Sequence, residues 1–201
     1  MHTQVWLSVG LVCFGASSLA AIAPAPLPAK AAAAVYTVDP VHSITLFRVK
    51  HLGVSYSYGR FKDVAGSFAF DAADPSKCSI EMSVKTASVE TGDLKRDEHL
   101  KSPDFFNEKQ FGAITFKSTK VEKRDDTHFT VTGDFAMHGV TKSIKVEIEK
   151  VGEGKDPLGG YRMGVETTFT LKRSDFGMKY GVPDMVGDDV RVTISVEGIR
   201  K

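Results

Sequence analysis

The sequence predicts an all-β protein, with eight antiparallel strands that close into a barrel and one short helix near residues 93–100. Apolar and polar residues alternate with a period of two in successive runs from residue 36 onward, which is typical of strands with one buried face. Turn-forming Asp, Gly and Pro residues separate the runs, and helical periodicity is nearly absent. We predict closure into a barrel because closure removes the exposed edges of a sheet.

Residues 1–33 are predicted to be a secretory signal peptide, which leaves a single domain over residues 34–201. An uncharged apolar run spans Val5–Ala23, and prolines and the small-residue run Ala31–Ala34 follow it, as expected for a cleavable export signal. The first four residues contain no Lys or Arg, and the run approaches the length of a membrane anchor, so an uncleaved anchor is the alternative. Cleavage would leave Cys78 as the single thiol, and we expect no internal disulfide.

The predicted strands are eight alternating runs. In order, they are residues 36–38 together with 43–51, then 66–71, 80–89, 113–122, 128–137, 143–151, 161–171 and 190–199. The facing is clearest in the sixth run, where Ile144, Val146 and Ile148 alternate with charged residues. Short polar connections between the runs favour antiparallel neighbours.

The helix is expected between the third and fourth of these strands. The segment Thr91–Phe106 places a few apolar residues among charges. Thr91 or Gly92 can stand near the start of a helix, and Ser102-Pro103 can end it. We expect this helix to plug or rim one end of the barrel.

Charge and motifs exclude several classes of function. The chain holds 26 basic and 25 acidic residues, for a net charge of +1, so it lacks the basic field that strong nucleic-acid binding requires. It contains no Walker A loop, zinc-ligand cluster, dinucleotide fingerprint or nucleophile elbow. We therefore expect neither a metal nor a cofactor.

Four blocks of sequence, taken in order, resemble the YceI-like polyisoprenoid-binding family. They are DPVHSITLFRVKHLGVSYSYGRFKDVAGSFAFD at residues 39–71, KRDEHLKSPDFF at 95–106 leading into FGAITF at 111–116, GDFAMHGVTK at 133–142, and RSDFG at 173–177 followed by VGDDV at 186–190. Together they span nearly all of residues 35–200. One small departure is Phe111-Gly112-Ala113, where an aromatic-Pro pair is more usual, and it alters only a turn.

The resemblance implies a lipocalin-like, elongated barrel that is exported to the periplasm and holds a long isoprenoid chain in its interior. Family ligands include polyprenyl compounds, isoprenoid quinones and other amphiphilic lipids. The resemblance establishes no reaction, so we predict binding, transport or storage of such a lipid rather than catalysis. We expect broad specificity for tails, with the headgroup read at the mouth of the barrel.

The residues expected to contact the ligand are apolar and aromatic side chains that the alternation turns inward. They are Phe47, Val49, Phe68, Phe70, Met82, Val84, Phe116, Phe135, Ile144, Val146, Phe169, Val192 and Ile194. Phe47 and Val49 are the least defined, because residues 43–51 are apolar in both phases. Ordinary core packing is the alternative for the whole set, since periodicity does not distinguish a hollow barrel from a filled one.

Four histidines, His42, His51, His99 and His138, raise the question of a metal or acid–base site. None of them shows a ligand spacing such as His-x3-His, so we expect structural or mouth-lining roles, with His42 bonding Asp39 or nearby backbone.

Two alternative functions stay open. A lipid-modifying enzyme would use His99 with Asp97 on the predicted helix, or His42. A quinone-linked accessory of a membrane electron-transfer protein would bind the same kind of tail for redox delivery.

Further expectations concern one end of the barrel. Arg173 and Asp175 fall at a strand end, and we hypothesise an ion pair between them and the helix. Met178, Tyr180 and Met185 lie in a Gly-rich stretch, which suggests a flexible loop over a lipid entrance. An exposed apolar mouth would favour a homodimer and transient contact with the inner membrane.

Overall fold

A computed structural model describes residues 32–200 of the chain. The predicted signal peptide therefore lies almost wholly outside the described residues. The strands are β1 (Ala34–Val38), β2 (Ile44–His51), β3 (Ser55–Phe61), β4 (Val64–Phe70), β5 (Ser79–Lys85), β6 (Val89–Glu90), β7 (Ala113–Lys123), β8 (His128–Met137), β9 (Val140–Lys155), β10 (Tyr161–Lys172) and β11 (Val186–Arg200). The helices are α1 (Leu94–Lys101) and the short 3-10 helices η1 (Pro75–Lys77), η2 (Thr86–Ser88) and η3 (Arg173–Phe176). Within the described range, no helix has both the length and the apolar character needed to cross a membrane.

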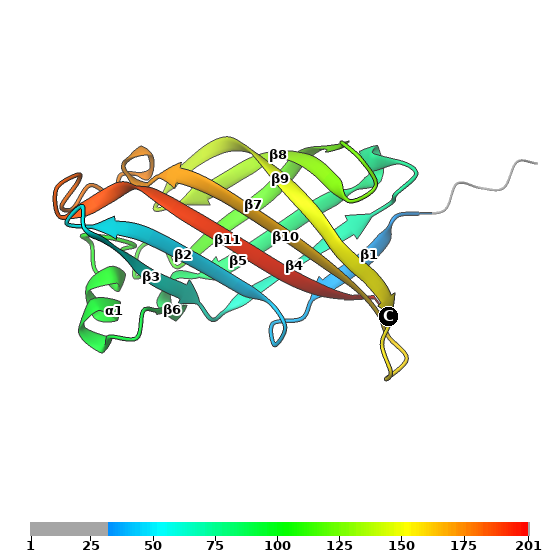
Figure 1. The fold of residues 1–201 in the computed structure, drawn as a ribbon, viewed down its shortest axis with the longest axis horizontal. Coiled ribbons are helices and arrows are strands. Elements are labelled where there is room, and N and C mark those ends of the chain that lie inside the picture. Colours follow the sequence, from blue (N-terminus) through cyan, green and yellow to red (C-terminus); the bar gives the residue numbers. More distant parts are fainter. Residues whose placement is uncertain (1–31, 201) are drawn as a thin grey trace, which may run out of the picture. The chain divides into compact units, whose positions relative to one another are not determined.

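The strands form a closed, eight-stranded antiparallel barrel, as predicted (Figure 1). Its order is β1–β4–β5–β7–β8–β9–β10–β11, and β1 closes the ring by pairing with β11 through Thr37 and Val38. The other three segments lengthen this wall, because β2 also pairs with β11, β3 pairs with β2, and β6 pairs with β3. Each of the first three strands of the barrel is thus split into two segments: β1 with β2, β3 with β4, and β5 with β6. Each complete strand lies beside the next one along the chain.

The strand predictions were incomplete at β3. The aromatic row of this segment, Tyr56 and Tyr58, is exposed, and the phase that Phe61 shares holds only Ser and Gly. The segment therefore lacks the apolar inward row by which the other strands were predicted. Its Gly59 is buried, and a Cβ there would lie 2.3 Å from the Phe47 ring. Glycine allows that ring to lie directly against the strand. β9 and β11 are also longer than predicted, at 16 and 15 residues.

The predicted helix is confirmed within one residue of its expected bounds. Asp93 caps the N-terminus of α1 and accepts a hydrogen bond from the Arg96 N–H at 2.8 Å. Ser102 caps the C-terminus, and Pro103 follows it. In Figure 1, α1 lies at one end of the barrel, near the β2–β3 hairpin and the loop that follows β10.

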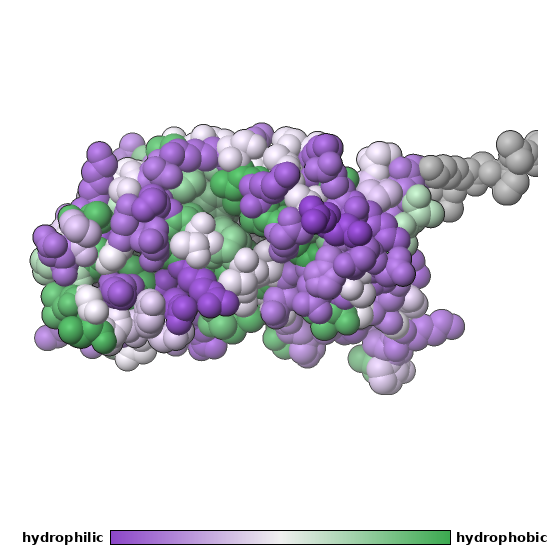
Figure 2. Space-filling view, turned by 45° about the horizontal axis from the view of Figure 1, so that its top comes forward, coloured by the Kyte–Doolittle hydropathy of each residue, from purple (hydrophilic) through white to green (hydrophobic). Residues whose placement is uncertain are grey.

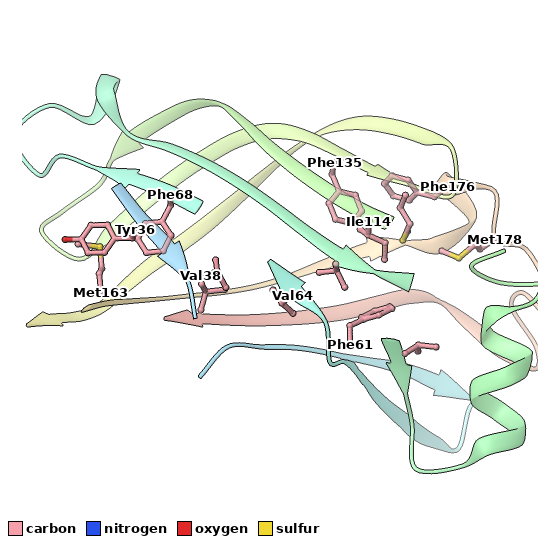
Figure 3. Close-up of a cluster of buried hydrophobic side chains, with 14 residues drawn as sticks. Tyr36, Val38, Phe61, Val64, Phe68, Ile114, Phe135, Met163, Phe176 and Met178 are labelled. Atoms are coloured by element: carbon pink, nitrogen blue, oxygen red, sulfur yellow. The ribbon is translucent and has the colours of Figure 1, made fainter. Parts of the chain in front are cut away.

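The opposite end of the barrel is filled by packed side chains (Figure 3). Tyr36 stacks on Phe68 with ring centroids 5.1 Å apart, and the nearby Met163 is 0% exposed. Gly198 pairs with Met163 across the β10–β11 ladder, and a Cβ on Gly198 would lie 2.6 Å from the Phe68 ring. These residues close this end of the barrel, so any internal space must lie nearer α1.

Candidate ligand cavity

Residues 32–200 enclose two apolar cavities in the barrel interior. The larger, which we call the outer chamber, has a volume of about 340 Å³ and reaches the end of the barrel near α1. The smaller, the inner chamber, has a volume of about 100 Å³. The residues common to both linings mark the junction between the chambers: Met82, Phe116, Phe135, Phe169 and Ile194. An apolar cavity of about 150 Å³ admits benzene, so the outer chamber is large enough for a hydrocarbon ligand.

All of the residues predicted to contact a ligand line one or both chambers. The outer chamber takes Phe47, Val49, Met82, Val84, Phe116, Phe135, Phe169, Val192 and Ile194. The remaining members line the inner chamber only: Phe68, Phe70, Ile144 and Val146. The pairing of β2 with β3 and β11 turns Phe47 and Val49 inward and leaves Leu46 exposed. Ligand contact by these residues stays a prediction, but the space for it is present.

The outer chamber opens between α1, the β2–β3 hairpin and the loop between η3 and β11. Met178, Tyr180 and Met185 line the chamber, as expected for a loop over an entrance. Leu52 in the hairpin donates its N–H to the Met185 carbonyl at 2.9 Å, which joins the hairpin to this loop. The exposed side chains of Leu52, Val54, Tyr180 and Met185 form what we call the mouth rim.

Arg173 holds the loop of the mouth in place. It is 3% exposed and donates hydrogen bonds to the carbonyls of Gly187, Met178, Tyr180 and Val186 at 2.7–3.2 Å. The hypothesised ion pair with the helix is therefore wrong for Arg173, because its donors are turned to loop carbonyls. It is also wrong for Asp175, whose carboxylate lies 3.3 Å from Lys142 Nζ.

His99 and Asp97 do not form the pair that the enzyme alternative requires. His99 Nε2 lies 2.8 Å from Asp104 Oδ2, and the ring packs edge-on against Phe105 and Tyr180. Asp97 is buried and accepts hydrogen bonds from the N–H and hydroxyl of Thr91. A helix places residues two apart on different faces, so both side chains serve the attachment of α1.

A cluster of Asp39, His42 and Glu197 has oxygen and nitrogen atoms close enough to hold a metal ion. Arg162 already occupies it, since its guanidinium bonds Asp39 at 2.8 Å and also bonds Glu197 and Asp156. His42 Nδ1 lies 2.8 Å from Asp39 Oδ2, as the sequence suggested. Hydrogen bonds from His42 and Arg162 hold the pKa of the Asp39 carboxyl well below its usual range. The cluster is an ionic lock between the β1–β2 turn and β10.

Several lining residues were not predicted. Thr45 shares the inward phase of Phe47 and Val49, so the alternation places it in the lining, but a polar side chain does not by itself indicate an inward position. Phe61 belongs to the strand that was not predicted. Phe105 and Phe106 follow α1 and reach the chamber only because of where that helix lies, which no local pattern shows.

Within the closed barrel, one pair of neighbouring strands, β9 and β10, is joined by a ladder over only part of its length. The β9–β10 ladder ends at the pair Thr167–Ile148, so Val140–Glu147 of β9 and Thr168–Lys172 of β10 make no ladder with each other. The inward side chains of this stretch include Ile144 and Phe169, which are only half-buried. Figure 2, with the side of β8 and β9 turned toward the viewer, shows an apolar hollow in a largely polar surface.

A closed antiparallel barrel with an apolar chamber that opens at one end is an architecture that can hold an apolar ligand. The sequence model of the YceI-like domain family matches residues 36–198 of this chain. The chain therefore belongs to the YceI-like family.

Relatives and solved structures agree with this assignment. The chain is 41% identical over 174 residues to a UPF0312 protein of Ectopseudomonas mendocina, covering 86% of this chain and 91% of the relative. The crystal structure of a Campylobacter jejuni YCEI protein superposes with a TM-score of 0.66 and 33% sequence identity. The match covers 76% of this chain and 90% of that protein's chain. The fold alone is shared with Burkholderia cenocepacia BcnA (TM-score 0.73, 23% identity, 80% of this chain and 98% of that one). It is also shared with a polyisoprenoid binding domain from Saccharophagus degradans (TM-score 0.65, 14% identity, 84% and 99%).

Proposed function

We propose that the protein binds a long-chain isoprenoid lipid, a polyprenyl compound or an isoprenoid quinone, inside the barrel and carries or stores it in the periplasm. The observation that carries this proposal is the outer chamber, about 340 Å³ of space lined mainly by apolar and aromatic side chains. The same fold serves a polyisoprenoid binding domain in Saccharophagus degradans, which supports the class of ligand. The family and this neighbour favour a binding protein over an enzyme.

Apolar burial supplies a sufficient free energy of binding. Each buried methylene-sized group contributes about 0.8 kcal/mol, so one isoprene unit contributes roughly 4 kcal/mol. The loss of translational and rotational freedom on association costs about 4–15 kcal/mol. A few buried isoprene units therefore offset this cost, and the wall needs no polar contacts to do so.

The mouth rim is the surface through which we propose exchange with a membrane. Its members Tyr180 and Met185 are exposed and line the chamber, and the exposed Leu52 and Val54 lie on the β2–β3 hairpin, which a hydrogen bond from Leu52 joins to Met185. A tail that passes from a bilayer across this rim avoids transfer through water, which is the costly step for a hydrocarbon.

The experiment is identification of lipid that copurifies with the protein. The full chain is expressed with its leader, purified from the periplasmic fraction, and extracted with organic solvent for mass spectrometry. We expect an unmodified polyprenyl compound or isoprenoid quinone, and an absorbance that bleaches on reduction would identify the quinone. An extract without isoprenoid above that of an unrelated periplasmic protein would contradict the proposal.

A matched pair of variants controls for the location of the lipid. Val49→Trp fills part of the outer chamber, whereas Lys50→Trp places the same ring on the exposed face of β2. We expect the first variant to lose most of the copurified lipid and the second to retain it. Equal retention by both would place the lipid outside the barrel.

A further inference from the structure

The outer chamber contains one buried hydroxyl that the protein leaves without a partner. Thr45 of β2 is 5% exposed and lines the chamber. Among residues 32–200, no group hydrogen-bonds its Oγ1 atom. An unpaired hydroxyl in an apolar wall costs free energy that a valine of similar shape would not. The hydroxyl is therefore placed for a partner that the chain itself does not supply.

Thr45 lies where the two chambers meet. It pairs with Ile194 of β11, which lines both chambers, and with Phe61 of β3. The Phe61 ring packs against Phe47 at 5.6 Å and against Phe106 at 5.3 Å between centroids. The Thr45 hydroxyl is thus a buried polar group beside a cluster of aromatic rings.

Three other polar side chains of the outer chamber already have hydrogen-bond partners. The Thr91 hydroxyl bonds Asp97, His99 bonds Asp104, and Arg173 donates to loop carbonyls. Arg173 is also distant, because it lies six residues beyond Thr167, the β10 partner of Ile194. At about 3.3 Å per residue this is roughly 20 Å along the strand.

Among residues 32–200, each Lys or Arg side chain that lines a chamber is already hydrogen-bonded. Arg96 of α1 donates to the hydroxyl and the carbonyl of Thr91. The lysine that lines the inner chamber, Lys150, is bonded to Glu153 at 3.1 Å. A charged group such as a phosphate would lose its hydration at the junction without a countercharge. An uncharged oxygen needs only one hydrogen bond there, which Thr45 can donate or accept.

We propose that the Thr45 hydroxyl is the internal hydrogen-bond contact of the ligand, and that the ligand carries an uncharged oxygen, a hydroxyl or carbonyl, that reaches the junction of the chambers. This inference rests on the proposed lipid-binding function. It places the polar group of the lipid inside the barrel rather than at the mouth, and it selects against prenyl phosphates.

The test compares three ligands of equal length on delipidated protein: geranylgeraniol, the corresponding hydrocarbon without the hydroxyl, and geranylgeranyl monophosphate. We expect the alcohol to bind about tenfold more tightly than the hydrocarbon, the ratio that a single buried hydrogen bond sustains, and the phosphate to bind more weakly than the alcohol. Thr45→Val should abolish the preference for the alcohol, and Thr45→Ser should keep it. Thr170→Val, at an exposed position of β10, should leave the ratio unchanged.

The outcomes separate the two proposals. Failure of all three ligands to bind would overturn both the lipid-binding function and the role of Thr45. If the Thr45 hydroxyl bonds only a trapped water, the ratio of the affinities for alcohol and hydrocarbon should be the same in wild type and in Thr45→Val. That result would overturn the role of Thr45 and leave the lipid-binding proposal standing. Without ligand, Thr45→Val should melt at the same or a higher temperature than wild type, and a lower melting temperature would reveal an internal partner and refute the proposal.

Discussion

Replacing Arg173 with alanine should both destabilise the barrel and speed the release of bound lipid. Arg173 is almost fully buried, and its guanidinium joins four backbone carbonyls of the loop that carries part of the mouth rim. Its removal leaves these carbonyls without their donors, and the loop loses the group that ties it to the end of β10.

The expected size of the effect follows from the burial of the bonds. The bond to the Met178 carbonyl is fully buried, and the other three are partly buried. A buried carbonyl without a partner costs about 1–3 kcal/mol, whereas partly buried carbonyls recover water and cost less. We expect a total loss of roughly 3–5 kcal/mol, which lowers the melting temperature by about 10 °C in a domain of this size.

The assay is thermal and denaturant unfolding, followed by the rate at which a loaded prenyl alcohol leaves the protein for empty vesicles. Arg173→Lys keeps the charge but not the planar fork of donors, so most of the loss should persist. Arg191→Ala, an exposed arginine of β11, is the control and should change neither quantity. A loss below about 1 kcal/mol with unchanged release would refute the argument, because it would mean that water replaces the guanidinium freely.

The remaining predictions concern the ionic lock, the closed end and the leader. Asp39→Asn should lower stability at neutral pH, because the ionised carboxylate of Asp39 stabilises the fold. Folding lowers the pKa of this carboxyl from its ordinary value of 3.8, so the stabilisation is present at pH values above 3.8 and is lost as the pH falls below that value. Melting curves of variant and wild type should therefore converge in acid, and a constant gap would contradict the pKa argument. Gly198→Ala should cost about 1–3 kcal/mol by overpacking, since a Cβ would meet the Phe68 ring, while Gly152→Ala, with open space around it, should be neutral. Equal melting temperatures for the two glycine variants would count against the packing at the closed end. Intact mass of the exported protein should show that residues 1–33 are removed, and a full-length mass would favour the anchor.

Much of the fold could be predicted because alternation is a local property of the chain. The inward row Ile144, Val146 and Ile148 can be read directly from the charged residues between its members. The helix could be predicted for a similar reason, because the capping residues at its start and the Ser-Pro pair at its end are local sequence signals. The candidate lining followed from the same patterns, and each predicted member lines a chamber.

The contacts of charged groups were harder to predict. The hypothesis that Arg173 or Asp175 pairs with the helix failed, because both side chains find nearer partners that lie beside them only after the barrel closes. The acid–base pair of His99 with Asp97 that the enzyme alternative would use does not form, because a helix turns side chains two residues apart to different faces. His99 instead contacts Asp104. Hydrogen-bond partners of long side chains depend on positions fixed by several elements at once.

The sequence by itself determined the strand periodicity, the position of the helix and which faces of most strands are apolar, because these depend on neighbours along the chain. Tertiary structure alone decided which phase of β2 turns inward, where β3 lies, and that the interior is hollow near α1 and filled by Tyr36 and Phe68 at the other end. The physical reason is that empty volume and strand register arise between residues far apart in the chain. Thr45 of β2 pairs with Ile194 of β11, and no local sequence pattern predicts that two residues so far apart in the chain are neighbours.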